Sequence, residues 1–152
     1  MRTSVLLRAV IGIAVIAGMW GGLGLRAQGG MYTVSLHALS KDAMEPVALT
    51  NSNGMTLYYN TSDTATSSSC TGDCAKVWPP LLSDGKPTSD PATVAGARIR
   101  GVVSAVQTAN GSQVAYNGHL LYTYTGDAAP GEATGKGKAG KWYVATPVLA
   151  QW

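Results

Sequence analysis

A segment of the chain is repeated 64 residues further on, from 53–78 to 117–142, with no gap between the two copies. The residues that recur are types that form turns or anchor folds. They are Asn53, Gly54, Leu57, Tyr58, Thr61, Asp63, Ala65 and Trp78, which match Asn117, Gly118, Leu121, Tyr122, Thr125, Asp127, Ala129 and Trp142. An internal repeat usually marks one supersecondary unit per copy. The sequence therefore predicts two related β units that share one core.

The first 27 residues have the features of an export signal. Arg2 and Arg8 precede seventeen uncharged, mostly apolar residues at 9–25, and Leu25-Arg26-Ala27 is an acceptable cleavage site. The alternative is a retained membrane anchor, but seventeen residues are short for a spanning helix and five of them are glycine. We predict a signal peptide at 1–27, with membrane contact only if this segment is not removed.

The remaining chain, residues 28–152, is close to electrically neutral. Removal of the leader leaves eight basic and eight acidic residues, so the charge gives no support to nucleic-acid binding. About 125 residues are enough for one domain with its own core. Few charges, many Ser, Thr, Gly and Tyr residues, and no Phe fit an exported β protein. We predict a single β domain that is secreted or periplasmic.

Strand-like segments separated by turn residues run through this domain. Residues 47–50 and 55–59 flank Asn53 and Gly54, and an Asn-Gly pair between two such segments is a strong hairpin signal. Other expected elements are a strand at 32–37, a helical turn at 74–76, a meander of strands at 99–107, 113–116 and 120–124 with turns at 110–111 and 117–118, and a last strand at 141–147.

The predicted fold class is mostly β. No segment after the leader shows sustained helical periodicity. The expected architecture is two related β-hairpin or meander units, at about 47–82 and 99–147, packed as one small domain with long loops and one short-range disulfide.

The disulfide is expected between Cys70 and Cys74, which enclose a short loop that contains a glycine. Oxidising compartments favour such a bond, and the loop-entropy estimate gives it about 2 kcal/mol. The alternative is a metal site, because two thiolates can hold Cu(I) or Zn(II). His119 or His37, with a methionine such as Met55, would then complete the ligand set.

The repeated motifs resemble those of a known family. Residues 58–63 and 122–127 are similar to the Tyr-x-aromatic-x-x-Asp motif of a secreted repeat family of unknown function, also described as predicted lipoproteins. The Cys-x-x-x-Cys and Trp-Pro-Pro segment at 70–81, and second-copy signatures at 113–121, 130–131 and 140–143, resemble the same family. The resemblance covers about 47–147 and implies export and a shared fold, but no established activity.

Two positions depart from the family pattern. The aromatic position of the motif is Tyr124 in the second copy but Asn60 in the first, so the role of that ring is absent there or is supplied by Tyr59. The lipid-attachment cysteine of many relatives is missing, which indicates a soluble form.

The repeated side chains have a structural and a functional interpretation. They are Tyr58, Asp63, Trp78, Tyr122, Tyr124, Asp127 and Trp142. In the structural interpretation, the two aspartates accept hydrogen bonds from the amides of the loops that follow, and the two tryptophans are equivalent core or loop anchors. In the functional one, the aspartates and neighbouring tyrosines bind a cation or a sugar at two equivalent sites, although one carboxylate per copy is few for calcium.

The sequence contains no recognisable catalytic constellation, and no Ser-His-Asp arrangement or phosphate-binding loop is evident. We therefore expect a non-enzymatic exported β-repeat protein without a cofactor, which serves as a binding or structural module for a partner in the cell envelope or outside the cell. Exposed tyrosine-bearing strands are part of this expectation. The alternative is a periplasmic copper-binding or redox-accessory protein that uses Cys70, Cys74 and His119. The oligomeric state is left open.

Overall fold

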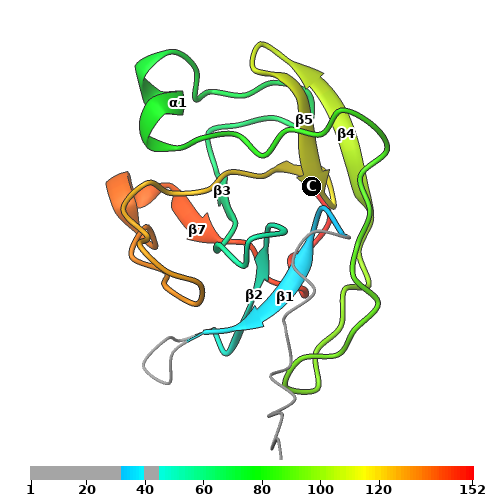
Figure 1. Ribbon diagram of the computed structural model, residues 1–152. Helices are drawn as coiled ribbons and strands as arrows, with labels where there is room; N and C mark the ends of the chain where they lie inside the picture. The colour runs from blue at the N-terminus through cyan, green and yellow to red at the C-terminus, as the bar shows by residue number, and fades with distance from the viewer. Residues whose placement is uncertain (1–31, 40–44) are drawn as a thin grey trace, which may run out of the picture.

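The computed structural model describes residues 32–39 and 45–152, so the predicted signal peptide lies outside the described residues. This part of the chain consists mostly of short strands and loops (Figure 1). The elements are β1 (Ser35–Ala38), β2 (Val47–Thr50), β3 (Tyr58–Asn60), α1 (Asp73–Val77), β4 (Val103–Thr108), β5 (Gly111–Tyr116), β6 (His119–Leu120), the 3-10 helix η1 (Lys138–Gly140) and β7 (Trp142–Val144).

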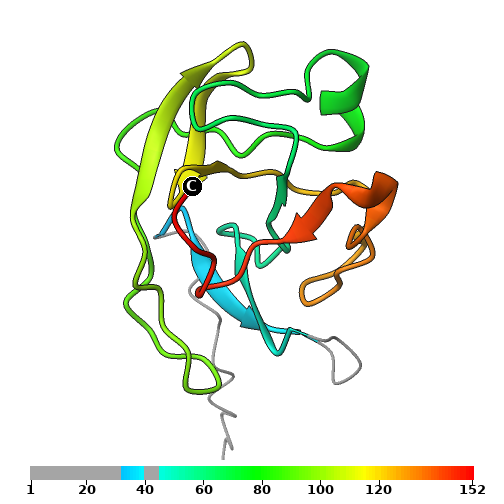
Figure 2. The same ribbon diagram turned by 180° about the vertical axis from the view of Figure 1, so that it is seen from behind.

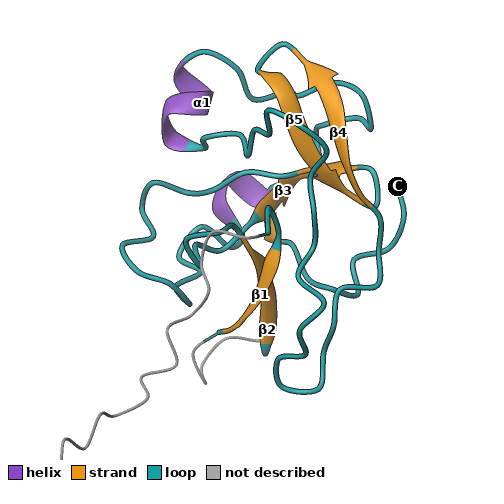
Figure 3. Ribbon diagram, turned by 45° about the vertical axis from the view of Figure 1, so that its right-hand side comes forward, coloured by secondary structure: helices purple, strands orange, loops and turns teal. Residues whose placement is uncertain are grey.

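The strands form three small antiparallel sheets, β1-β2, β3-β7 and β4-β5-β6. Figure 3 shows these sheets linked by long loops, with the β4-β5 pair at one end and the β1-β2 pair at the other. Neither helix in the described ranges is long and apolar enough to cross a membrane. The predicted mostly β fold with two repeat units is confirmed.

The hairpin predicted around Asn53 and Gly54 is present but short. The N–H of Asn51 donates to the carbonyl O of Met55 (3.0 Å), and Thr50 lies opposite Thr56. Beyond that point the second arm leaves β2, because β3 pairs with β7 from the second copy. The pairing of the first hairpin therefore extends less far than the sequence predicts.

The predicted meander is formed by β4, β5 and β6. Its first turn lies one residue earlier than expected, because Thr108 and Gly111 are paired across residues 109–110. Gly111 has a φ of 113°, a conformation open to glycine at little cost. The predicted helical turn and last strand correspond to α1 and β7.

The two copies are related by an approximate two-fold arrangement centred on Tyr58 and Tyr122. The N–H of Tyr58 donates to the carbonyl O of Tyr122 (2.8 Å), and the N–H of Tyr122 donates to the carbonyl O of Tyr58 (2.9 Å). These residues occupy equivalent positions in the repeat, 64 residues apart. The strands of the two copies therefore meet directly at the centre of the domain.

Each copy is completed by a segment of the other copy. In the first copy, three backbone N–H groups form a closed ring of hydrogen bonds: Leu49 to Ala145 (2.8 Å), Ala145 to Leu57 (2.8 Å) and Leu57 to Leu49 (2.9 Å). In the second copy, the equivalent ring runs from Val114 to Leu81 (2.8 Å), from Leu81 to Leu121 (2.9 Å) and from Leu121 to Val114 (2.9 Å). The segment that follows each repeated tryptophan is thus exchanged between the copies.

Candidate functional site

The repeated tyrosines and aspartates form hydrogen bonds between the copies. The phenol of Tyr58 donates to Oδ2 of Asp127 (2.7 Å), and the phenol of Tyr122 donates to Oδ2 of Asp63 (2.7 Å). The Tyr122 hydroxyl also lies 2.7 Å from the Ser68 hydroxyl oxygen. Each copy therefore supplies the acceptor for the tyrosine of the other.

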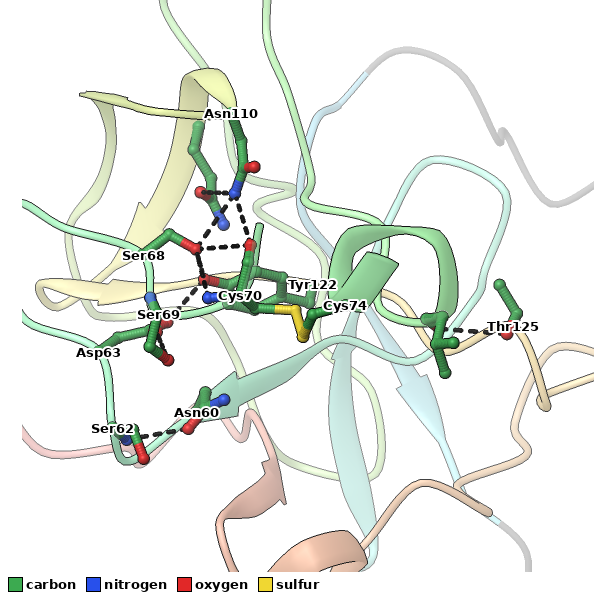
Figure 4. The surroundings of a disulfide bond; sticks show 12 residues. Asn60, Ser62, Asp63, Ser68, Ser69, Cys70, Cys74, Asn110, Tyr122 and Thr125 are labelled. Carbon is green, nitrogen blue, oxygen red and sulfur yellow. Dashed lines mark hydrogen bonds between the residues drawn. A yellow bond between two sulfur atoms is a disulfide. The ribbon is translucent and has the colours of Figure 1, made fainter. Parts of the chain in front are cut away.

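The second carboxylate oxygen of each aspartate holds the loop that follows it. Oδ1 of Asp63 accepts from the backbone N–H and the hydroxyl of Ser69 (both 2.7 Å), as Figure 4 shows. Oδ1 of Asp127 accepts from the N–H (2.8 Å) and hydroxyl (2.6 Å) of Thr134. The aspartates do bond to the amides of their own loops, while the second bond to a tyrosine of the other copy was not expected.

All four of these side chains lie in the interior. Tyr58 and Tyr122 have no exposed surface, and Asp63 and Asp127 are only 4% and 6% exposed. The expectation of exposed strands carrying these two tyrosines is therefore wrong, because the reciprocal pairing turns both rings inward. With both oxygens of each carboxylate already bonded, the geometry favours the structural interpretation over cation or sugar binding at these residues.

Burial raises the pKa of Tyr58 and Tyr122 well above the ordinary value, and the hydrogen bonds to the carboxylates add to the rise. The unfolded chain releases these protons near about pH 10, whereas the folded chain keeps them. Because the unfolded state then binds fewer protons, stability is expected to fall as the pH rises above 10.

A titration of phenolate absorbance should show that Tyr58 and Tyr122 ionise only when the protein unfolds. The exposed tyrosines should titrate first, without loss of structure. Reversible ionisation of all seven tyrosines in the folded protein would contradict the described burial.

The repeated tryptophans stack on each other at the centre of the core. The ring centroids of Trp78 and Trp142 are 3.9 Å apart and their planes differ by 3°. Tyr58 meets Trp78 edge-on at 5.4 Å, and Tyr122 meets Trp142 edge-on at 5.1 Å. A Cβ on Gly135 would lie 2.7 Å from Trp78, so this close approach requires glycine. The predicted anchoring role of the tryptophans thus lies in the shared core.

The two copies differ at the third motif position. Tyr124 packs against Trp78 at 4.4 Å between ring centroids, and the Lys138 ammonium lies 5.2 Å from the Tyr124 centroid. Asn60 instead accepts a hydrogen bond from the N–H of Ser62 (2.8 Å) and holds the loop after β3. Tyr59 does not replace the missing ring, because it packs against His119 and Tyr143 on the other face of the strand.

The predicted Cys70–Cys74 disulfide is present and joins the loop after Asp63 to the start of α1 (Figure 4). The Cys70 carbonyl accepts hydrogen bonds from the Asn110 amide (3.0 Å) and the Ser68 hydroxyl (2.9 Å), so the bond lies beside the Tyr122–Asp63 pair. Copper ligation by the two sulfurs would first require reduction.

Breaking the disulfide is expected to lower the free energy of unfolding by about 2 kcal/mol, because a short loop loses its constraint. Urea unfolding of the protein with and without reductant measures this difference. Reductant should have no effect on the Cys70→Ser/Cys74→Ser variant. An unchanged unfolding midpoint on reduction of the native protein would contradict this expectation.

His119 lies away from this arrangement, between the rings of Tyr59 (4.9 Å) and Trp152 (4.7 Å). Its Nε2 is 3.2 Å from the carbonyl O of Ala150, and burial lowers its pKa despite that bond. Within residues 32–39 and 45–152, no group of three or more His, Cys, Asp or Glu side chains is arranged to hold a metal ion. His119 therefore contributes to holding the C-terminal segment.

The surface carries an apolar cleft that the sequence did not predict. It has a volume of about 460 Å³ and lies between residues 45–47 at the start of β2 and residues 146–149 after β7. The rings of Tyr59 and Tyr143 stack at 5.9 Å along one wall, and residues 95 and 97 contribute to another. Lys136 and Glu45, also part of the lining, form an ion pair at 2.5 Å.

The residues of this cleft are specific to one copy. The repeat position of Tyr59 is Thr123 in the second copy, and the position of Tyr143 is Pro79 in the first. Side chains shared by the copies thus build the core, whereas unshared ones line the cleft. Such differences between the copies are the sequence signal that could have pointed to it.

Comparison with known families supports the repeat. A family model described as a secreted repeat of unknown function matches the chain twice, at residues 47–82 and 104–146. These ranges cover more than half of the chain and agree with the predicted units, so the resemblance drawn from the motifs is confirmed. No curated protein and no solved structure gave a match.

Proposed function

Because the chain belongs to the family of secreted repeats of unknown function, we propose that it is a non-enzymatic binding module that works in the cell envelope or outside the cell. The cleft between residues 45–47 and 146–149 is its ligand site. This cleft is the observation that carries the proposal.

The lining of the cleft has the character of a ligand site. Ligand sites combine an apolar wall with a few placed polar groups. Here Val47, Val144 and Leu149 supply apolar surface, and two tyrosines and the Lys136–Glu45 pair supply polar groups. Because the two charges neutralise each other, an uncharged and mainly apolar ligand suits the cleft better than an ion.

The scaffold is suited to holding this cleft in a fixed shape. Tyr59 and Tyr143 are paired directly across β3 and β7, so the aromatic wall stands on a sheet. That sheet rests on the buried tryptophan pair and is tied by hydrogen bonds to both copies. A preorganised site of this kind loses little conformational freedom on binding. The disulfide is compatible with an oxidising location such as the periplasm.

Binding of the fluorescent apolar probe 8-anilinonaphthalene-1-sulfonate tests the proposal. Val148 is part of the lining and is 86% exposed, so Val148→Asp should keep the fold while it places a charge in the cleft. We expect this variant to bind the probe about tenfold more weakly than the native protein. Val102→Asp is the matched control, since Val102 is 61% exposed and lies outside the lining.

The native protein and Val102→Asp should bind the probe equally. Equal weakening in the two aspartate variants would show an effect of charge alone and would contradict the proposed site. Absence of probe binding to the native protein would also count against it.

A further inference from the structure

The cleft begins where the symmetry between the copies ends. In the second copy, the strand pairing that starts with Val114 N–H to Leu81 O continues with Ser83 N–H to Ser112 O at 3.0 Å. In the first copy, Leu49 N–H to Ala145 O is the equivalent first bond. The residue that would donate the next one is Pro147, 64 positions after Ser83, and proline has no N–H.

The acceptor of that missing bond faces the cleft. Leu39 N–H donates to Pro46 O across β1 and β2 (3.1 Å), which makes residues 39 and 46 a hydrogen-bonded pair. Such pairs alternate with non-hydrogen-bonded ones, so Val47, opposite Ala38, directs its N–H and carbonyl away from β1. In the part of the chain that the structure describes, neither group takes part in any other hydrogen bond.

The C-terminal segment is held away from this edge. Leu149 N–H donates to Thr146 O (3.1 Å) in a turn, and the Tyr116 phenol donates to Pro147 O (2.8 Å). The Asn117 amide donates to Leu149 O (2.8 Å). Figure 2 shows this segment in red as it runs from β7 toward the end of β5. The space beside Val47 is therefore kept open by specific bonds.

We propose that the cleft binds an extended peptide segment of another protein, which adds a strand to the free edge of β2 at Val47. This inference rests on the proposed function and names the class of ligand. Its geometric template is the second copy, where Ser83 already makes the equivalent bond to Ser112. The site is also continuous with the interface between the copies, because Leu49 pairs with Ala145 at the next position of the same edge.

The walls define the kind of peptide that fits. Residues 45–47 span about 10 Å of strand, enough for about three peptide residues. Side chains that alternate toward Tyr59, Tyr143 and Val148 would meet apolar surface, and the internally neutralised ion pair requires no net charge on the peptide. Strand addition draws affinity from the main chain and selectivity from alternate side chains.

Three synthetic peptides test this assignment on the full mature protein. They are acetyl-Val-Thr-Val-Thr-Val-amide and two versions that carry backbone N-methyl groups either on the valines or on the threonines. Because one set of amides faces β2 in a bound strand and the other faces away, we expect one methylated peptide to bind at least about tenfold more weakly than the other. The unmethylated peptide should displace the fluorescent probe and slow hydrogen exchange at the Val47 amide by about tenfold.

Equal binding of the two methylated peptides, or unchanged exchange at Val47, would overturn the strand assignment. If the native protein binds the fluorescent probe but not the peptides, the proposed cleft stands and the peptide inference fails. If it binds neither, both fail. Dimerisation of the native protein that Val148→Asp abolishes would assign the edge to a second copy of this chain and would also overturn the inference.

Discussion

Replacement of Asp127 by alanine is expected to lower the free energy of unfolding by about 4 kcal/mol, measured by urea unfolding. The carboxylate accepts three hydrogen bonds, from the Tyr58 phenol and from the N–H and hydroxyl of Thr134. Without it, the phenol and the amide lose their acceptor inside the core. The cost is large because a buried donor that loses its partner keeps its full desolvation penalty.

Asp73→Ala is the matched control for this replacement. Asp73 forms an ion pair with Lys76, but its side chain is 95% exposed, so we expect a loss below about 0.5 kcal/mol. Asp63→Ala should resemble Asp127→Ala, because Asp63 accepts equivalent bonds from Tyr122 and Ser69. A small effect of Asp127→Ala, comparable to that of Asp73→Ala, would contradict the described role of the carboxylate.

Replacement of Trp142 by alanine is expected to cost a further large amount, about 4 kcal/mol of unfolding free energy. Trp142 is 3% exposed, stacks on Trp78 and packs against the edge of Tyr122. Its removal leaves a cavity at the contact between the copies. The measurement is the urea midpoint, with circular dichroism to confirm that the variant folds.

Trp152→Ala supplies the comparison of the same residue type. Trp152 is 53% exposed and contacts His119 at 4.7 Å, so its removal should cost about 1 kcal/mol or less. Similar losses for the two tryptophans would show that the stacked pair is not the centre of stability.

The sequence was sufficient to predict the architecture in outline. The 64-residue repeat indicated two units, and the Asn-Gly pairs located turns near Gly54 and Gly118, both of which have positive φ. The Cys spacing in an exported chain indicated the disulfide, which the structure contains. These features are local, and local patterns determine turns and short loops with little help from the rest of the fold.

The exchange between copies could not be predicted in the same way. The repeat shows that Tyr58 and Asp63 recur as Tyr122 and Asp127, but it does not show which tyrosine meets which aspartate. Pairing within a copy and pairing between copies give the same sequence pattern. The choice depends on how the units pack, and this is also why both tyrosines are buried rather than exposed.

The cleft was missed because it depends on a difference between the copies. Pro147 stands where the second copy has Ser83, and this loss of one N–H coincides with a gap beside Val47. A single substitution of this kind has meaning only when the hydrogen-bond partner of the position is known. The copper hypothesis for Cys70, Cys74 and His119 stays a prediction, for which thiol titration and metal analysis of aerobically purified protein are the test.

The central claim is that the two copies fold as one unit through their reciprocal contacts. Native-state hydrogen exchange at the amides of Tyr58 and Tyr122 tests it directly, because each amide donates to the carbonyl of the other residue. In the native protein the two amides should have equal protection, and Asp127→Asn should reduce both by the same factor, on the order of a hundredfold. A reduction confined to one of the two amides would show that the copies open independently and would contradict the claim.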